Sequence, residues 1–167
     1  MMRRTIARRA APWILAAVAV LLPSLALGPA AGTAPAGLST ATAFVTVDGL
    51  GRSVRLDERH AHIALDAMWW VLGDVPAIAP VNGGPRLLAT LRLNEQVLDV
   101  TIWKAPTLIV ASRRLSNVSA IVFPVTGLWR HRVLVVEMGR VEASPRLVDS
   151  VSVAALDDAV RSAIGPR

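Results

Sequence analysis

The chain has no cysteine among its 167 residues, and none of the common catalytic motifs occurs in it. The lack of cysteine excludes disulfides, thiolate metal sites, a cysteine nucleophile and the lipid-bearing cysteine of a lipoprotein. No G-x-S-x-G elbow, H-E-x-x-H helix, P-loop or G-x-G-x-x-G turn is present. We therefore expect no cofactor and no catalysis, although a serine and a histidine assembled by the fold would leave no such pattern.

Excess positive charge is confined to the N-terminus. The net charge is +6, but four of the eighteen basic residues are Arg3, Arg4, Arg8 and Arg9, and all twelve acidic residues lie at Asp48 or later. The remaining fourteen basic residues face twelve acidic ones, which leaves a net charge of +2. A nearly balanced domain has no electrostatic reason to bind phosphate backbones, so we expect no nucleic-acid partner.

No charged residue occurs over residues 10–47, and an unbroken apolar run over 13–22 follows the N-terminal arginines. This layout is typical of a secretory signal peptide, and small residues up to Ala36 offer a cleavage site that leaves Gly37 first. The alternative is an uncleaved anchor over 10–27, because that segment approaches the length of about 20 residues that spans a bilayer. Either interpretation predicts an exported bacterial domain, secreted or associated with the cell envelope, and only the anchor predicts membrane contact.

The clearest fold signal lies in the middle of the chain. Residues 87–93 and 97–103 both alternate between apolar and polar side chains, as half-buried strands do. The polar residues 94–96 between them suit a tight turn. A two-residue loop sets Leu91 opposite Leu98 and gathers the apolar side chains on one face. We therefore predict an antiparallel hairpin in that register.

The other segments predict an α+β fold. Asp57 and Gly73 fit the caps of a helix over 58–72, and Ser152 fits the N-cap of a helix over 153–164. Strands and helices do not alternate regularly, so we expect one small domain with a mostly antiparallel sheet of about 6–7 strands and both helices on one face. The further expected strands are 44–47, 53–56, 107–111, 118–123 and 133–138. The prolines and glycines of residues 75–85 predict an irregular connection. The chain is therefore expected to consist of a signal peptide or anchor at 1–36, a tether at 37–43 and the domain at 44–165.

Two histidines in the first predicted helix suggest a metal site. On a helix, Glu58, His62 and Asp66 recur every four residues and could reach one ion, whereas on a strand His60 and His62 would share a face. Imidazole and carboxylate ligands suit zinc or copper. The alternative is a solvated first helical turn, where acidic residues favour the helix N-terminus. We take His60, His62 and Asp66 as candidate ligands.

Trp69, Trp70 and Trp129 are candidate ligand-binding residues. Exposed tryptophans could stack on sugar rings of a cell wall or insert at a membrane surface. The alternative is burial, because large aromatic side chains mostly fill cores. Neighbouring residues on a helix cannot both face the core, so we expect Trp69 or Trp70 to be exposed.

These observations predict a small exported domain with a non-catalytic binding or structural role, whose partner is an envelope component or another protein. The first alternative is an exported protein that binds metal through His60 and His62. The second alternative is a small secreted hydrolase whose site is assembled in space, which requires a serine or carboxylate beside a histidine in a pocket.

Overall fold

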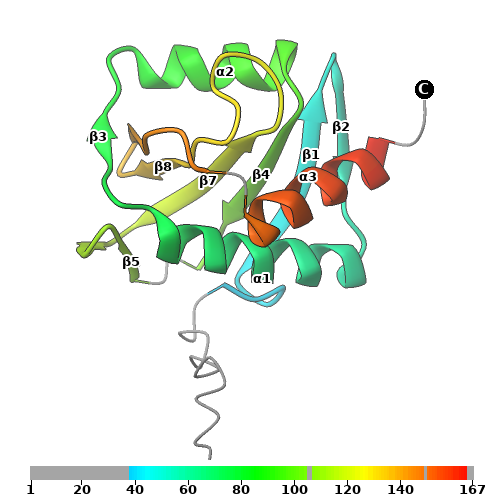
Figure 1. The fold of residues 1–167 in the computed structure, drawn as a ribbon, viewed down its shortest axis with the longest axis horizontal. Helices are drawn as coiled ribbons and strands as arrows, with labels where there is room; N and C mark the ends of the chain where they lie inside the picture. The colour runs from blue at the N-terminus through cyan, green and yellow to red at the C-terminus, as the bar shows by residue number, and fades with distance from the viewer. Residues whose placement is uncertain (1–37, 105–106, 149, 165–167) are drawn as a thin grey trace, which may run out of the picture. The chain divides into compact units, whose positions relative to one another are not determined.

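The computed structural model describes residues 38–104, 107–148 and 150–164; the predicted signal peptide and its cleavage site lie outside this part of the chain. An antiparallel sheet of seven strands, in the order β2-β1-β4-β7-β8-β9-β3, forms the centre of the domain (Figure 1). A separate two-stranded sheet contains β5 and β6. The strands are β1 (Ala43–Gly49), β2 (Arg52–Arg55), β3 (Ala79–Pro80), β4 (Val97–Ile102), β5 (Leu108–Val110), β6 (Arg113–Leu115), β7 (Val118–Pro124), β8 (Leu134–Glu137) and β9 (Arg140–Ala143), and the helices are α1 (Glu58–Asp74), α2 (Gly84–Asn94) and α3 (Val151–Ile164). The α+β class with a largely antiparallel sheet is therefore confirmed.

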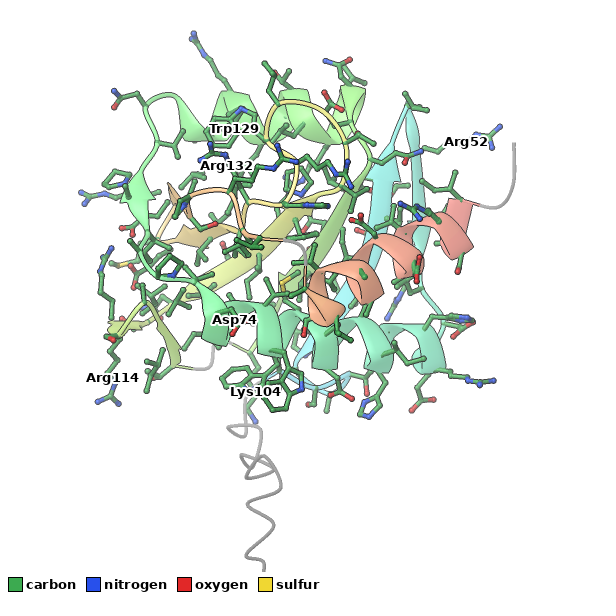
Figure 2. The ribbon with its side chains drawn as sticks, in the orientation of Figure 1. Arg52, Asp74, Lys104, Arg114, Trp129 and Arg132 are labelled. Atoms are coloured by element: carbon green, nitrogen blue, oxygen red, sulfur yellow. The ribbon has the colours of Figure 1, made fainter. Side chains whose placement is uncertain are left out.

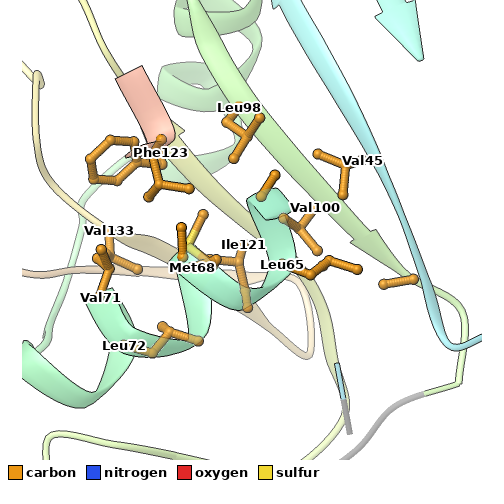
Figure 3. Packing of buried hydrophobic residues seen from close by; sticks show 14 of the residues in the cluster. Val45, Leu65, Met68, Val71, Leu72, Leu98, Val100, Ile121, Phe123 and Val133 are labelled. Carbon is orange, nitrogen blue, oxygen red and sulfur yellow. The ribbon is translucent and has the colours of Figure 1, made fainter. Parts of the chain in front are cut away.

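Helices cover both faces of the sheet. On one face, Val100 and Ile121 belong to a core that includes Met68 of α1 and side chains of α3 (Figure 3). On the other face, Leu91 of α2 belongs to a second cluster with Val122. Successive side chains of a strand point to opposite faces, so β7 contributes Ile121 to one cluster and Val122 to the other. The two predicted helices, α1 and α3, therefore share one face as expected, and a third helix that was not predicted, α2, covers the opposite face.

The predicted central hairpin is also wrong. Residues 87–93 lie within α2, and β4 pairs with β1 and β7, so the pairing of Leu91 with Leu98 does not form. The leucines of this segment fit both the alternating repeat of a strand and the repeat of a helix. In the structure Leu88 and Leu91 are buried at the i, i+3 spacing of a helix. Pro85 in the first turn, together with the strong helix formers Leu, Ala and Arg that follow, favours the helix.

The predicted strand at 107–111 forms as β5, but it pairs with β6 and not with β4. The two strands are joined at Ala111 and Ser112, which both have positive φ, at 51° and 61°. Two consecutive residues of positive φ characterise the tight turns that match the twist of a hairpin. Residues 113–115 therefore form the second strand of this hairpin, β6. Elsewhere, residues 75–85 were predicted to be irregular, but they contain β3 and the start of α2.

Local signals located the first hairpin and the start of the first helix correctly, whereas the helix continues past the predicted cap Gly73 and ends at Asp74. The segments 44–47 and 53–56 form β1 and β2, and the Asp57 side chain accepts a hydrogen bond from the backbone N–H of His60 at the start of α1. This hydrogen bond lowers the pKa of the Asp57 carboxyl. The last helix begins earlier than predicted, because Ser150 and not Ser152 accepts from the backbone N–H of Val153. None of the helices in the described ranges is long and apolar enough to cross a membrane.

Candidate functional site

The three candidate metal ligands lie on α1 without surrounding one position. His60 Nδ1 lies 2.8 and 2.7 Å from the two carboxylate oxygens of Asp57, at the helix cap. His62 Nε2 lies 3.4 Å from Asp66 Oδ2, and both of these side chains are exposed. Within residues 38–104, 107–148 and 150–164, no group of three or more histidine, aspartate or glutamate side chains could hold a metal ion. A metal site at His60, His62 and Asp66 stays a prediction, with the His62–Asp66 contact as its preformed part.

The three candidate tryptophans lie on separate parts of the domain. Trp69 is partly buried against the main core, and its neighbour Trp70 is exposed, as expected for adjacent positions on a helix. Trp129 is partly buried against the second cluster, and the guanidinium carbon of Arg132 lies 5.5 Å from its ring centre. Figure 2 places Trp129 and Arg132 beside α2, on the side of the domain away from α1. The three tryptophans therefore do not form a single aromatic surface.

A fourth tryptophan makes an aromatic contact that the sequence pattern did not reveal. Trp103 stacks on Phe44 with ring centres 5.6 Å apart, and the guanidinium carbon of Arg55 lies 5.3 Å from the Phe44 ring centre. Phe44 of β1 lies opposite Thr101 of β4, which brings Trp103 close. Only the pairing of β1 with β4 could have predicted this contact, and the hairpin prediction had given β4 a different neighbour.

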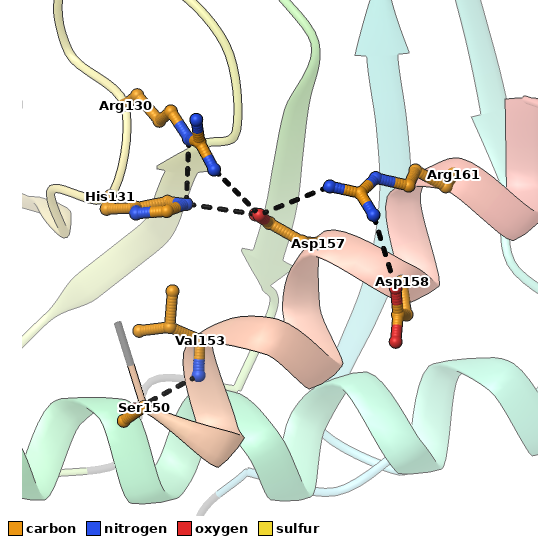
Figure 4. Close-up of polar contacts among 7 residues, drawn as sticks. All are labelled: Arg130, His131, Ser150, Val153, Asp157, Asp158 and Arg161. Carbon is orange, nitrogen blue, oxygen red and sulfur yellow. Dashed lines mark hydrogen bonds and ion pairs between the residues drawn. The ribbon is translucent and has the colours of Figure 1, made fainter. Parts of the chain in front are cut away.

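A buried polar cluster connects the loop after β7 to α3. His131 Nε2 lies 3.1 Å from Asp157 Oδ2 and 3.0 Å from Arg130 Nε (Figure 4). The same Asp157 oxygen lies 3.4 Å from Arg130 Nη2 and 3.8 Å from Arg161 Nη2. A ring nitrogen has one site in the ring plane, so Nε2 either donates to Asp157 or accepts from Arg130. The guanidinium groups of Arg130 and Arg161 place two positive charges beside the Asp157 carboxylate.

The His131–Asp157 pair has the composition of a catalytic dyad but the surroundings of a structural contact. His131 is only 1% exposed, and its ring stacks on Phe123 with ring centres 5.9 Å apart. Ser144, a buried serine, donates to the carbonyl of Pro145 and accepts from the backbone N–H of Val133. A nucleophile must contact both its base and its substrate. This geometry fits a connection between the loop and α3, and it provides no support for the hydrolase alternative.

A groove lies between the end of α1 and the start of α3. It has a volume of about 310 Å³ and lies at the small end of the range for ligand sites. Its polar lining residues are Asp74, Arg146 and Ser150, and the rest of the lining is apolar, from Val71, Pro76, Leu147, Val148 and Val153. Val148, one of these lining residues, is almost fully exposed. The sequence did not predict this groove, because it forms only where α1 and α3 lie side by side (Figure 1).

Comparison of the chain with protein-family models, with curated proteins and with solved structures finds no match.

Proposed function

We propose that this protein is an exported, non-catalytic binding domain, and that it holds an extended segment of an envelope protein in the groove between α1 and α3. The sequence pattern of the N-terminal residues supports export, because arginines precede an apolar run that ends in small residues. The groove is the observation that carries the binding role.

The shape and lining of the groove favour a peptide segment over a compact small molecule. A volume of about 310 Å³ accommodates one or two aliphatic side chains, and the exposed Val148 carries the apolar lining out to the surface. Asp74 and Arg146 contribute charges of opposite sign. An extended peptide with an apolar residue between an acidic and a basic one matches this arrangement.

Fluorescence anisotropy of labelled hexapeptides tests the binding role with the full chain. We expect a peptide with a central leucine between lysine and aspartate to bind at least tenfold more tightly than the same peptide with a central serine, since burial of a leucine contributes about 1.5–3 kcal/mol. Val148→Asp should abolish the preference, because it places a charge in the apolar lining. Met138→Asp changes an exposed residue of the β8–β9 turn and should leave it intact.

Equal binding of the two peptides, or equal binding by wild type and Val148→Asp, contradicts the role of the groove. Export is tested separately by a C-terminal fusion to alkaline phosphatase, which is active only outside the cytoplasm. An inactive fusion at normal expression contradicts export.

Metal binding is a second candidate function because His62 and Asp66 already lie 3.4 Å apart. If it operates, zinc should raise the melting temperature of the wild type but not of His62→Ala. An equal response of the two proteins contradicts a site at His62.

A further inference from the structure

Three exposed leucines lie at one end of the domain, and we call Leu50, Leu93 and Leu128 the leucine edge. Leu50 is in the turn between β1 and β2, Leu93 is in the last turn of α2, and Leu128 is in the loop between β7 and β8. Their exposed fractions are 56%, 61% and 95%. Figure 1 shows the β1–β2 turn, the end of α2 and this loop at the same end of the sheet. Single exposed leucines are ordinary, but three from separate segments at one end need an explanation.

Tight packing around Glu95 brings the three segments together. A Cβ placed on Gly49 would lie 2.8 Å from the carbonyl oxygen of Glu95, and one placed on Gly127 would lie 2.1 Å from a carboxylate oxygen of Glu95. The Thr126 hydroxyl donates to the Glu95 carboxylate at 2.6 Å and accepts from the backbone N–H of Gln96 at 2.9 Å. Gly49 precedes Leu50, Gly127 precedes Leu128, and Glu95 follows closely on Leu93. The common location of the leucines is therefore fixed by packing.

The backbone at Leu50 makes its side chain harder to explain by stability alone. Leu50 has a φ of 53°, in the left-handed region that leucine rarely adopts, and it lies between Gly49 and Gly51. Asparagine or glycine would suit this turn better. The Leu50 side chain is exposed, so its burial does not offset the cost of this backbone conformation. Contact with another molecule is therefore the simplest reason for an apolar side chain at this position.

Arginines accompany the leucines along the chain. Arg52 follows Leu50 by two residues, Arg92 directly precedes Leu93, and Arg130 follows Leu128 by two. Arg52 is exposed and lies on the outer strand β2 (Figure 2), whereas Arg92 and Arg130 are partly exposed and also bind Asp99 and Asp157. Two acidic residues, Asp48 and Glu95, also lie at this end, and the Glu95 carboxylate accepts from Thr126. The outward chemistry of the leucine edge is therefore apolar, with Arg52 as its exposed cation.

We propose that the leucine edge docks on the surface of an anionic lipid bilayer. The leucines would enter the boundary between headgroups and acyl chains, and Arg52 would contact the lipid phosphates. A stable contact with a second protein buries about 800 Å² on each side, which is more than three leucine side chains offer. A bilayer has no such requirement, because each apolar side chain that enters it contributes separately. This site lies apart from the groove and does not depend on the peptide-binding role.

A fluorophore at one position tests the proposal in the full chain, because the absence of cysteine makes single labelling clean. Leu128→Cys carries a polarity-sensitive label at the leucine edge. Met138→Cys is the matched control, because Met138 is exposed in a loop and its N–H donates to the carbonyl of Asn117, the residue just before β7, at the opposite end of that strand. Vesicles of phosphatidylglycerol are compared with vesicles of phosphatidylcholine.

We expect phosphatidylglycerol vesicles to shift the emission of the label at 128 to the blue, with little change at 138 and a weaker effect of phosphatidylcholine. Leu50→Asp and Leu93→Asp should each lower the affinity reported at 128 at least tenfold, which corresponds to about 1.4 kcal/mol. Arg52→Gln should weaken binding to the anionic vesicles only. The comparison of two positions on one chain separates docking of the edge from any contact made by the N-terminal residues.

An unchanged label at 128, an equal response at 128 and 138, or a response that Leu50→Asp leaves intact overturns the proposal. A blue shift at 128 that depends on protein concentration without lipid also overturns it, since it assigns the leucine edge to contact between copies of the chain. Retained circular dichroism in each variant shows that a lost signal is not a loss of folding.

Discussion

The ion pair between α2 and the sheet gives the sharpest test of the fold. Arg92 of α2 donates from Nε to Oδ2 of Asp99 at 2.6 Å, and its Nη2 lies 2.5 Å from the same oxygen. Asp99 lies in β4 and is only 2% exposed. Burial raises the pKa of the Asp99 carboxyl, and Arg92 acts in the opposite direction but does not reverse it. Replacing Arg92 with methionine leaves a buried carboxylate with much less compensation.

The cost of Arg92→Met follows from the burial of the two partners. Removing one partner of a fully buried pair costs about 3–5 kcal/mol. The Arg92 side chain is 39% exposed, so water can partly replace it, and we expect a loss of about 2–3 kcal/mol at neutral pH. For a domain of this size that corresponds to a decrease in melting temperature of about 10 °C. Arg86→Met is the matched control, because Arg86 is exposed on the same helix, and it should change stability by less than about 0.5 kcal/mol.

The pH dependence gives the same prediction a sign. A carboxyl with a raised pKa binds its proton more tightly in the folded state, so its contribution to stability is most favourable below the ordinary aspartate pKa and is lost as pH rises through the folded pKa. Arg92→Met raises that pKa further. The destabilisation should therefore be larger near pH 7 than near pH 4, because protonation of Asp99 removes the charge that Arg92 compensates.

Urea unfolding at the two pH values measures both quantities, and the double variant Arg92→Met/Asp99→Asn completes the cycle. Asp99→Asn removes the buried charge and should restore most of the stability that Arg92→Met loses at pH 7. A loss below about 0.5 kcal/mol for Arg92→Met, or a loss that does not depend on pH, refutes the assignment of Asp99 as a buried carboxylate held by α2.

Three further substitutions test other contacts. Gly127→Ala should destabilise the domain by more than 1 kcal/mol in urea unfolding, since Gly127 has a φ of 73° and its Cβ would meet the Glu95 carboxylate; an unchanged midpoint contradicts that packing. Ser150→Ala should cost about 0.5–2 kcal/mol in thermal unfolding, because Ser150 caps α3, whereas Ser152→Ala should cost less; the reverse order would restore the original cap prediction. Asp157→Asn should cost about 1–3 kcal/mol by calorimetry, while the exposed Asp158→Asn stays within about 0.5 kcal/mol; equal effects would contradict a structural role for the buried cluster.

Local chemistry predicted the elements whose signals are local. Asp57 marks the start of α1 because its side chain satisfies a backbone N–H within the same turn, and the glycines at 49 and 51 mark the first hairpin. The segment 87–93 differs, because its leucines fit both an alternating and a helical repeat. Pro85 and the helix-forming residues favour the helix locally, and the strand is excluded non-locally: β4 is already paired on both edges, by β1 and by β7, so no edge is left for an adjacent strand.

The same limit applies to the sites. His62 and Asp66 were found because they lie one helical turn apart, and their contact exists. The pairing of Asp99 with Arg92, of His131 with Asp157 and of Trp103 with Phe44 depends on which strands and helices become neighbours. No spacing along the sequence encodes those contacts, so pattern reasoning gave weight to the nearby histidines and none to the buried carboxylates.

The buried contacts also determine how the leucine edge is displayed. The loop that carries Leu128 is fixed before that residue by the contact of Thr126 with Glu95 and after it by the contact of His131 with Asp157. Its ends are also joined directly, since the backbone N–H of His131 donates to the carbonyl of Pro124 at 2.8 Å. A loop held on both sides keeps Leu128 exposed in one position, so little order is lost when the side chain enters a bilayer. Asp157→Asn should therefore weaken vesicle binding without changing any residue of the leucine edge, and its effect should be smaller than that of Leu50→Asp.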